Sequence, residues 1–117
     1  MDFNFPISWN NNKKILSKPW SSYPRYNIEE CDNYYIYHID VPGVEKKNLK
    51  LSITNYDMNI SGERFYTFDI EDAQYTYTES NYGVFSRNIL IKKDADTDSC
   101  KADLENGVLR IKINKLE

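Results

Sequence analysis

From residue 33 onward, apolar and polar positions alternate along most of the chain. Leu49, Leu51 and Ile53 are separated by polar residues, and Met58 and Ile60 repeat the pattern. A repeat of two places alternate side chains on opposite faces of a strand, so the pattern predicts half-buried β-strands. The segments that show it are 34–39, 49–53, 58–62, 82–91, 100–104 and 108–113.

Two short polar segments predict turns between these strands. Residues 55–57 separate two alternating runs, and Asn106-Gly107 stands between the last two. Asn-Gly is typical of a two-residue hairpin, because both residues tolerate a positive φ. Many short strands with almost no helical pattern predict an all-β protein, either an antiparallel sandwich or a barrel.

Residues 65–82 form an aromatic segment in which we expect two further strands, at about 66–70 and 74–78. This much apolar surface is more than a solvated loop leaves exposed without cost. We therefore expect a partner to cover the segment. Its aromatic side chains are Phe65, Tyr66, Phe68, Tyr75, Tyr77 and Tyr82.

Residues 1–32 lack a sustained period, and we expect them to form a largely irregular N-terminal arm. Three prolines, at 6, 19 and 24, exclude one long helix. The arm is more aromatic than an ordinary linker, so something apolar should contact it. Two interpretations stay open: the arm packs on its own body or a neighbouring subunit, or it is an adaptable surface for other proteins.

Composition and charge narrow the function. The 117 residues are 28% charged with a net charge of −3, which excludes collagen-like, low-complexity and fully disordered classes. The mild acidity argues against nucleic-acid binding, and the longest aliphatic run, residues 89–91, is too short to span a membrane. Cys31 and Cys100 lack the spacing of a disulfide framework or a zinc site. We expect a cytoplasmic protein without cofactor, nucleic-acid partner or membrane contact.

Five motifs occur in order along residues 40–109: Asp40-Val41-Pro42-Gly43-Val44, Ile60-Ser61-Gly62-Glu63-Arg64, Glu79-x-x-x-Gly83-x-Phe85-x-Arg87, Asp96-Thr97-Asp98 and Ala102-x-x-x-Asn106-Gly107-Val108-Leu109. Together they resemble the α-crystallin domain of the small heat shock proteins, the Hsp20 family. The resemblance covers residues 33–115 and implies an immunoglobulin-like antiparallel β-sandwich. The signature residues are Pro42, Gly43, Gly62, Gly83, Phe85, Ala102, Asn106, Gly107 and Leu109.

The resemblance also implies a function. It predicts an ATP-independent chaperone, not an enzyme, that holds unfolding client proteins and prevents their aggregation. Candidate client-binding residues are the arm aromatics Phe3, Phe5, Trp9, Trp20 and Tyr23. One alternative is a CS-type co-chaperone module that docks on a partner chaperone, which would lack the hairpin of residues 102–109. A second alternative is a tyrosine-rich carbohydrate-binding sandwich.

The resemblance further implies a homodimer, or a larger homo-oligomer, in which residues 65–82 cross to the partner subunit and add a strand to its sheet. Candidate interface residues are Phe68, Tyr75, Tyr77 and Arg87. Alternation places Arg87 in one row with Phe85 and Ile89, so its guanidinium needs a carboxylate or carbonyl partner. Only residues 116–117 follow the domain, so we expect no C-terminal extension with the family's Ile-x-Ile anchor.

Three other patterns have ordinary interpretations. Asp94, Asp96, Asp98 and Glu105 match the carboxylate spacing of a calcium-binding EF-hand loop, but Ser99 replaces the glycine that the loop requires. His38 has no Ser, Cys or second His at catalytic spacing. Residues 59–61 form a glycosylation sequon without a secretory signal. We expect no metal site and no catalysis.

Overall fold

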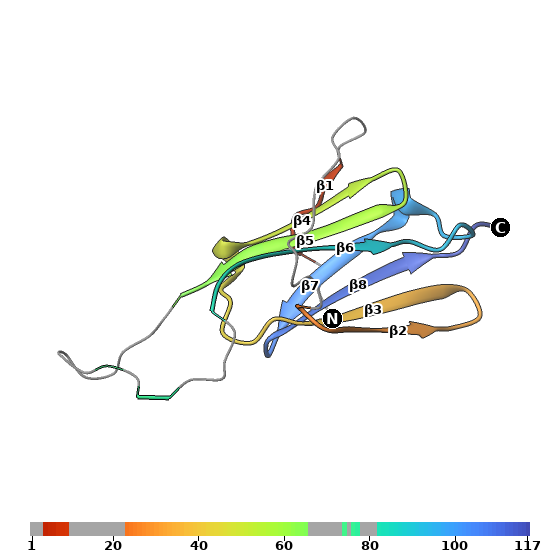
Figure 1. Cartoon of the computed structure of the whole chain (residues 1–117). Coiled ribbons are helices and arrows are strands. Elements are labelled where there is room, and N and C mark those ends of the chain that lie inside the picture. The colour runs from red at the N-terminus through yellow and green to blue at the C-terminus, as the bar shows by residue number, and fades with distance from the viewer. Residues whose placement is uncertain (1–3, 10–22, 66–73, 75, 78–81) are drawn as a thin grey trace.

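A computed structural model of the chain describes residues 4–9, 23–65, 74, 76–77 and 82–117. Two four-stranded sheets face each other, in the orders β1-β4-β5-β6 and β2-β3-β8-β7 (Figure 1). All pairings are antiparallel except β1 with β4, which confirms the predicted all-β, immunoglobulin-like sandwich. The strands are β1 Ser8–Trp9, β2 Tyr26–Glu30, β3 Tyr34–Asp40, β4 Leu49–Thr54, β5 Asp57–Arg64, β6 Gly83–Leu90, β7 Lys101–Glu105 and β8 Val108–Asn114, with 3₁₀ turns η1 Lys46–Asn48 and η2 Thr97–Ser99.

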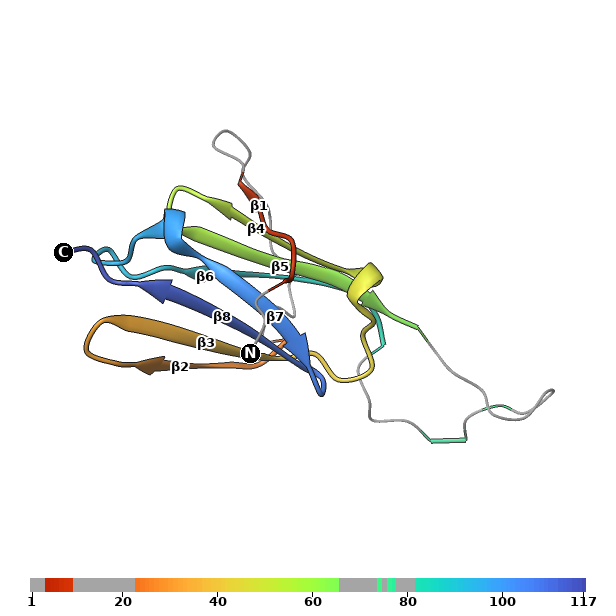
Figure 2. The ribbon, with the colours of Figure 1, turned by 180° about the vertical axis from the view of Figure 1, so that it is seen from behind.

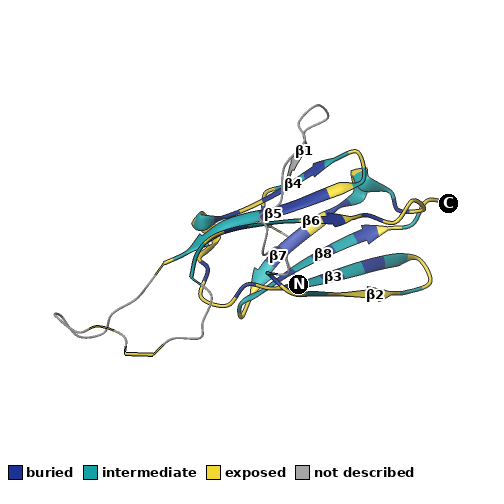
Figure 3. Cartoon of the chain, in the orientation of Figure 1, coloured by how far each residue is buried: buried dark blue, intermediate teal, exposed yellow. Residues whose placement is uncertain are grey.

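The core lies between the two sheets and follows the predicted alternation. On β3, Tyr35, Tyr37 and Ile39 are buried and pair in register with Ile113, Ile111 and Leu109 of β8. On the facing sheet, the buried residues of β4 and β5 include Leu51 and Ile60, which are register partners. Buried positions alternate with less buried ones along β3, β4 and β8, whereas residues 58–60 of β5 are buried in succession (Figure 3). One apolar layer therefore holds the sandwich together.

The predicted turns are confirmed. Asn55 and Tyr56 have φ values of 44° and 67° between β4 and β5, and Asn106 and Gly107 have φ values of 53° and 77° between β7 and β8. Positive φ at both central residues gives a turn whose twist matches the flanking strands. These turns set the register of the two hairpins.

The N-terminal region differs from the expected irregular arm. Residues 26–30 form β2, which pairs with β3 along its whole length. The side chains of β2 are mostly exposed, so the strand shows no burial pattern that sequence reasoning could detect. Phe5, also in the expected arm, is buried in the core with only 5% of its surface exposed. The strands expected at about 66–70 and 74–78 lie almost wholly outside the described residues.

The short β1 lies across the gap between two sheet edges. It pairs with β4, while Phe5 just before it forms a bridge with Ala102 of β7. Figure 2 shows this N-terminal segment running from β7 to β4. Among the described residues, no helix is long and apolar enough to cross a membrane.

Candidate functional site at the sheet edges

Arg87 joins the two sheets along the side formed by β2 and β6. Its neighbours in the row, Phe85 and Ile89, are each 1% exposed. The Nη1 of Arg87 donates a hydrogen bond to the Pro24 carbonyl oxygen at 2.8 Å, and the guanidinium lies 4.6 Å from the centroid of the Tyr26 ring. The Pro24 carbonyl, which lies just before β2, is therefore a partner of the kind that we expected for the Arg87 charge among apolar neighbours.

The surface beside Arg87 is a shallow basic pocket of about 760 Å³, lined by Arg25, Tyr26, Asn27, Ile28 and Arg87. Within the described residues, β2 pairs only with β3, so the N–H and C=O groups on its outer edge have no neighbouring strand. An unpaired edge is a template for another strand. Its charge and free edge make this pocket a candidate binding surface for an acidic, extended segment.

On this side of the sandwich, Tyr23 packs on the core and Arg64 contacts Tyr82, the last residue of the 65–82 segment. The Tyr23 ring packs edge-on against Phe85, with centroids 5.4 Å apart, and burial raises the pKa of Tyr23. The Arg64 guanidinium lies 4.7 Å from the centroid of the Tyr82 ring, and Arg64 pairs with Gly83 across β5 and β6. Tyr23 thus contacts the core, although we expected it to bind clients.

The remaining interface and client-binding candidates are only partly described. Tyr77 is 75% exposed, whereas Phe68 and Tyr75 lie outside the described residues. Phe3 and Trp20 also lie outside them, and Trp9 is placed by its backbone in β1. Phe5 is buried, so a client could contact it only after the segment detached.

The opposite side of the sandwich, between β4 and β7, is covered by the chain's own residues 5–9. The Phe5 amide donates to the Ala102 carbonyl oxygen at 2.7 Å, and Ile7 packs against the core. Ala102 itself is 1% exposed. Sequence reasoning missed this contact, because no periodic pattern marks a segment that bridges two sheets.

The family signature residues have structural roles in the sandwich. A Cβ at Gly62 would collide with the Asn48 carbonyl oxygen, and Gly43, with φ of 75°, lies against the Arg64 side chain. Phe85, Ala102 and Leu109 are buried side chains of the core. The other signature residues lie at turns or strand ends: exposed Pro42, Gly83 with φ of 95° at the start of β6, and the Asn106-Gly107 turn.

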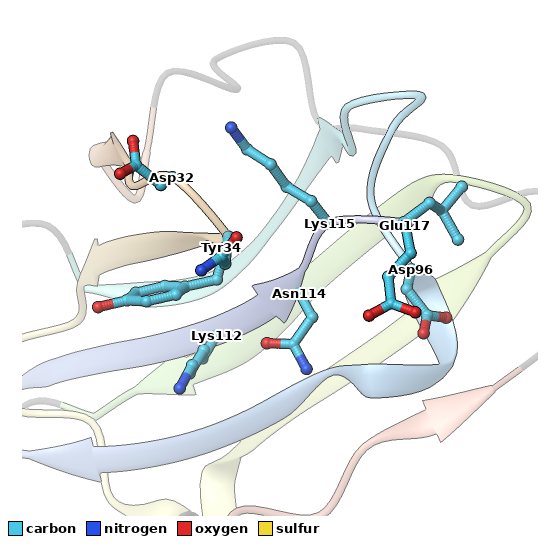
Figure 4. A pocket seen from close by; sticks show the side chains of 9 residues that line it. Asp32, Tyr34, Asp96, Lys112, Asn114, Lys115 and Glu117 are labelled. Carbon is cyan, nitrogen blue, oxygen red and sulfur yellow. The ribbon is translucent and has the colours of Figure 1, made fainter.

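An open pocket of about 770 Å³ lies at the end of the sandwich where the β2–β3 turn meets the residues after β8 (Figure 4). The two lysines that line it both contact neighbouring side chains. The Nζ of Lys115 lies 2.7 Å from Glu30 Oε2, and Lys112 lies 4.5 Å from the centroid of the Tyr34 ring. These contacts indicate a stabilising network more than a ligand site.

The other sequence patterns have local roles. Asp94 Oδ1 accepts a 2.7 Å hydrogen bond from the Tyr35 hydroxyl, which raises the pKa of Tyr35 to about 12. Asp96 Oδ1 accepts from the Asp98 amide and so caps η2. No group of three or more His, Cys, Asp or Glu suited to a metal ion occurs in the part of the chain that the structure describes.

His38 and the sequon are also placed in the sheets. His38 Nε2 lies 3.2 Å from Glu29 Oε1 on the outer face of the sheet. Asn59 is 4% exposed, and its amide donates to Ser86 Oγ at 2.9 Å and to Asn88 Oδ1 at 2.7 Å. The Asn59 side chain is therefore engaged within the folded sheet.

Comparison with known proteins places this fold in a family. A relative from Rickettsia felis, small heat shock protein C4, is 34% identical over 115 residues, which cover 98% of this chain and 66% of that protein. Spore protein SP21 of Stigmatella aurantiaca is 32% identical over 79% of this chain and 54% of its own length. The chain thus spans between about half and two-thirds of the length of these relatives.

Solved structures agree with the sequence relatives. HSP18.5 from E. histolytica superposes with a TM-score of 0.71 at 31% identity, covering 80% of this chain and 88% of that one. A small heat-shock protein from Xylella fastidiosa gives a TM-score of 0.71 at 29% identity, covering 80% and 86%. The Hsp20/alpha crystallin family matches residues 27–117. The chain belongs to the Hsp20/alpha crystallin family of small heat shock proteins.

Proposed function

We propose that this protein is an ATP-independent holdase that binds unfolding proteins and keeps them from aggregating. Membership in the small heat shock protein family supports a chaperone role in general. The observation that carries the finer proposal is the number of large apolar side chains exposed on the protomer. Those on or beside β6 and the 65–82 segment are Phe65, Tyr77, Val84 and Leu90, with exposed fractions of 54%, 75%, 50% and 75%.

Such a surface can hold clients without a nucleotide. An unfolding protein exposes apolar side chains, and covering them is favourable in proportion to the area removed from water. Binding to the unfolded client withdraws it from aggregation by mass action, with no chemical step. Scattered exposed apolar side chains impose no sequence code, which suits clients of many kinds. Phe3, Trp9 and Trp20 of the N-terminal region would add to this surface.

The turbidity of a heat-unfolding client tests the holdase function. We expect the protein in molar excess to suppress client scattering equally with and without ATP. The double variant Val84→Ser, Leu90→Ser should protect less, because it removes exposed apolar surface from one face of β6. Lys50→Ser, at an exposed polar position on β4 of the same sheet, is the control and should protect as the parent does. Unprotected clients, or protection only with ATP, would contradict the proposal.

The same proposal includes a homodimer across the open edge of β2. Residues 65–82 contain Asp69, Glu71, Asp72 and Glu79 and no Lys or Arg. Arg25 and Arg87 line the basic pocket beside β2. An acidic extended segment of one copy therefore complements the edge of the other in charge and in backbone hydrogen bonding.

Sedimentation of variants tests the dimer. Replacing Phe68 and Tyr75 together by Ser should shift the molecule toward monomer, and Arg87→Gly should weaken the dimer. Tyr56→Ser removes an aromatic ring from the distant β4–β5 turn and serves as the control. If both interface variants sediment as unchanged dimers, the contact between subunits lies elsewhere.

A further inference from the structure

The 65–82 segment leaves the sandwich after Arg64 and returns to it at Gly83. These two residues form the last register pair of the β5–β6 ladder, so both ends of the segment lie at one point. Tyr82 comes directly before β6 and lies outside the ladder. We call Arg64, Tyr82 and Gly83 the root of the segment. Figure 1 shows β5 and β6 side by side up to the root.

The Arg64 side chain restrains Tyr82 at the root. Its guanidinium lies 4.7 Å from the centroid of the Tyr82 ring, a distance at which a cation is attracted to an aromatic face. Gly83, the next residue, has a φ of 95°, which glycine adopts without the cost that a side chain would impose. A glycine backbone permits many chain directions, and the contact between Arg64 and Tyr82 restricts them.

Gly43 supplies the space in which the Arg64 side chain lies. Gly43 belongs to the loop between β3 and η1 and has a φ of 75°. A Cβ at this position would lie 2.6 Å from Nε and 3.1 Å from Cζ of Arg64, so a side chain here would displace the guanidinium. One arginine therefore contacts both the backbone of the β3–η1 loop and the Tyr82 ring.

Tyr23 is a third neighbour of Arg64. Burial raises the pKa of Tyr23, and the nearby positive charge of Arg64 opposes that rise. The Tyr23 ring packs edge-on against Phe85 of β6, with centroids 5.4 Å apart. Arg64 thus lies where three distant parts of the sequence meet, namely the residues before β2, the β3–η1 loop and the end of the 65–82 segment.

A restraint at the root affects association more than folding. Arg64 is half-buried at the end of β5, so its removal leaves no enclosed cavity and should cost the sandwich little. A segment that already has a fixed direction in the free protomer loses less conformational freedom when it binds a partner. The contribution counts twice in a symmetric dimer, because each subunit has its own root.

We propose that Arg64 is a positioning residue for the contact between subunits: packed against Gly43, it holds Tyr82 and so sets the direction in which the 65–82 segment reaches the partner. This inference rests on the proposed dimer across the β2 edge. It gives a joint role to two motifs, residues 40–44 and 60–64, because each supplies one half of a single contact.

Sedimentation equilibrium of Arg64→Met tests the inference. Loss of the cation–π contact in both subunits should raise the dissociation constant of the dimer about 5- to 30-fold. Urea unfolding at concentrations where only monomer is present should give nearly the parent midpoint. Arg64→Lys keeps the charge without the planar group and should also weaken the dimer. Lys101→Met removes an exposed charge from β7 and serves as the control.

A pair of glycine variants tests the contact from its other half. Gly43→Ala should displace Arg64 and weaken the dimer as Arg64→Met does. Gly107→Ala is the matched control, because Gly107 has a similar φ of 77° but a Cβ there would meet Pro42 at 3.4 Å and no arginine. Gly43→Ala combined with Arg64→Met should weaken the dimer no more than Arg64→Met alone, since both remove one interaction.

The outcomes separate this inference from the dimer on which it rests. A parent chain that sediments as a monomer at every concentration overturns both. A parent dimer whose dissociation constant is unchanged by Arg64→Met overturns the positioning role alone. So does full affinity in Arg64→Lys, which would indicate a simple charge effect. Equal weakening by Gly43→Ala and Gly107→Ala would indicate backbone strain and would likewise overturn the role.

Discussion

The two open sides of the sandwich are closed in different ways. Between β4 and β7, backbone pairing and the buried Phe5 fill the gap with the chain's own residues. Between β6 and β2, one guanidinium crosses from Arg87 to the Pro24 carbonyl oxygen, and the outer edge of β2 pairs with no described strand. The first side is closed by hydrogen-bonded backbone, whereas the second is closed by a side chain.

The difference indicates which contacts each side can make. A side-chain bridge closes the gap but leaves a row of backbone donors and acceptors available to another chain. A segment that pairs in cis satisfies those groups, and another chain can bind only after the segment leaves. We therefore expect another chain to associate directly with the β2 side, whereas the β4 side is already occupied by residues 5–9.

The largest expected effect concerns the core beneath the Arg87 bridge. Phe85→Ala removes a side chain that is 1% exposed and packs against Tyr23. It should lower the free energy of unfolding by about 3–5 kcal/mol in urea titrations. Val84→Ala, an exposed neighbour on the same strand, should change it by less than about 0.5 kcal/mol. Similar losses for the two variants would show that β6 is not anchored by Phe85.

Phe5→Ala should have the next largest effect and tests how firmly the β4 side is closed. We expect a loss of about 1.5–3 kcal/mol, the value of burying one large side chain, because the segment can detach without leaving a cavity enclosed by the core. Pro6→Ala changes the exposed neighbour and is the control. A Phe5→Ala cost as large as that of Phe85→Ala would make the segment integral to the core.

Arg87→Met tests the bridge on the β2 side. It removes a hydrogen bond to Pro24 and a cation–π contact with Tyr26, and we expect a loss of about 1–1.5 kcal/mol. Arg25→Met removes an exposed charge from the same pocket and should cost little. Thermal unfolding of the two variants in parallel separates the bridge from general charge effects. Equal shifts would contradict a specific role for Arg87.

Labelling of the two cysteines compares the β2 side with the β4–β7 side without any substitution. Cys31 lies next to β2 and is half-buried, whereas Cys100 precedes β7, is 6% exposed and has its pKa raised to about 12, mainly by burial. At pH 8, Cys31 should react with iodoacetamide and Cys100 should not, because the thiolate is the reactive form.

The buried thiol of Cys100 makes the stability of the fold decrease at high pH. The pKa of Cys100 is higher in the folded than in the unfolded chain. Burial of its thiol therefore contributes fully to the free energy of unfolding below about pH 8.5, and this contribution is lost as the pH rises toward 12. Cys100→Ala should flatten that part of the stability profile. Labelling of both thiols at equal rates at pH 8 would contradict the buried position of Cys100.

Much of the fold could be predicted from the sequence, because buried strands alternate. The apolar rows of β3, β4 and β8 and the Asn106-Gly107 turn all follow from local pattern. β2 could not be found in this way, since an edge strand with exposed side chains has no buried row to repeat. Whether a strand is visible in a sequence depends on how much of it is buried.

The candidate site was predictable only in part. The apolar neighbours of Arg87 in β6 predicted that its charge has a partner. They could not predict that the partner is the Pro24 carbonyl oxygen, because that contact depends on packing between segments far apart in the sequence. The burial of Phe5 was missed for a similar reason. Its slot exists only when two sheets are already assembled, so no local pattern contains it.

The pairing of β3 with β8 has a kinetic consequence. Tyr34 pairs with Asn114, so most of the domain lies between two strands that must meet before their sheet exists. The β4–β5 and β7–β8 hairpins can close early, because their strands are joined by tight turns, but this central pairing requires closure of a long loop. We expect the chain to fold over roughly milliseconds to seconds, as sandwiches dominated by distant pairings do. During that interval its own apolar strands are exposed, so a newly made molecule is briefly an aggregation-prone chain of the kind that this family is proposed to protect.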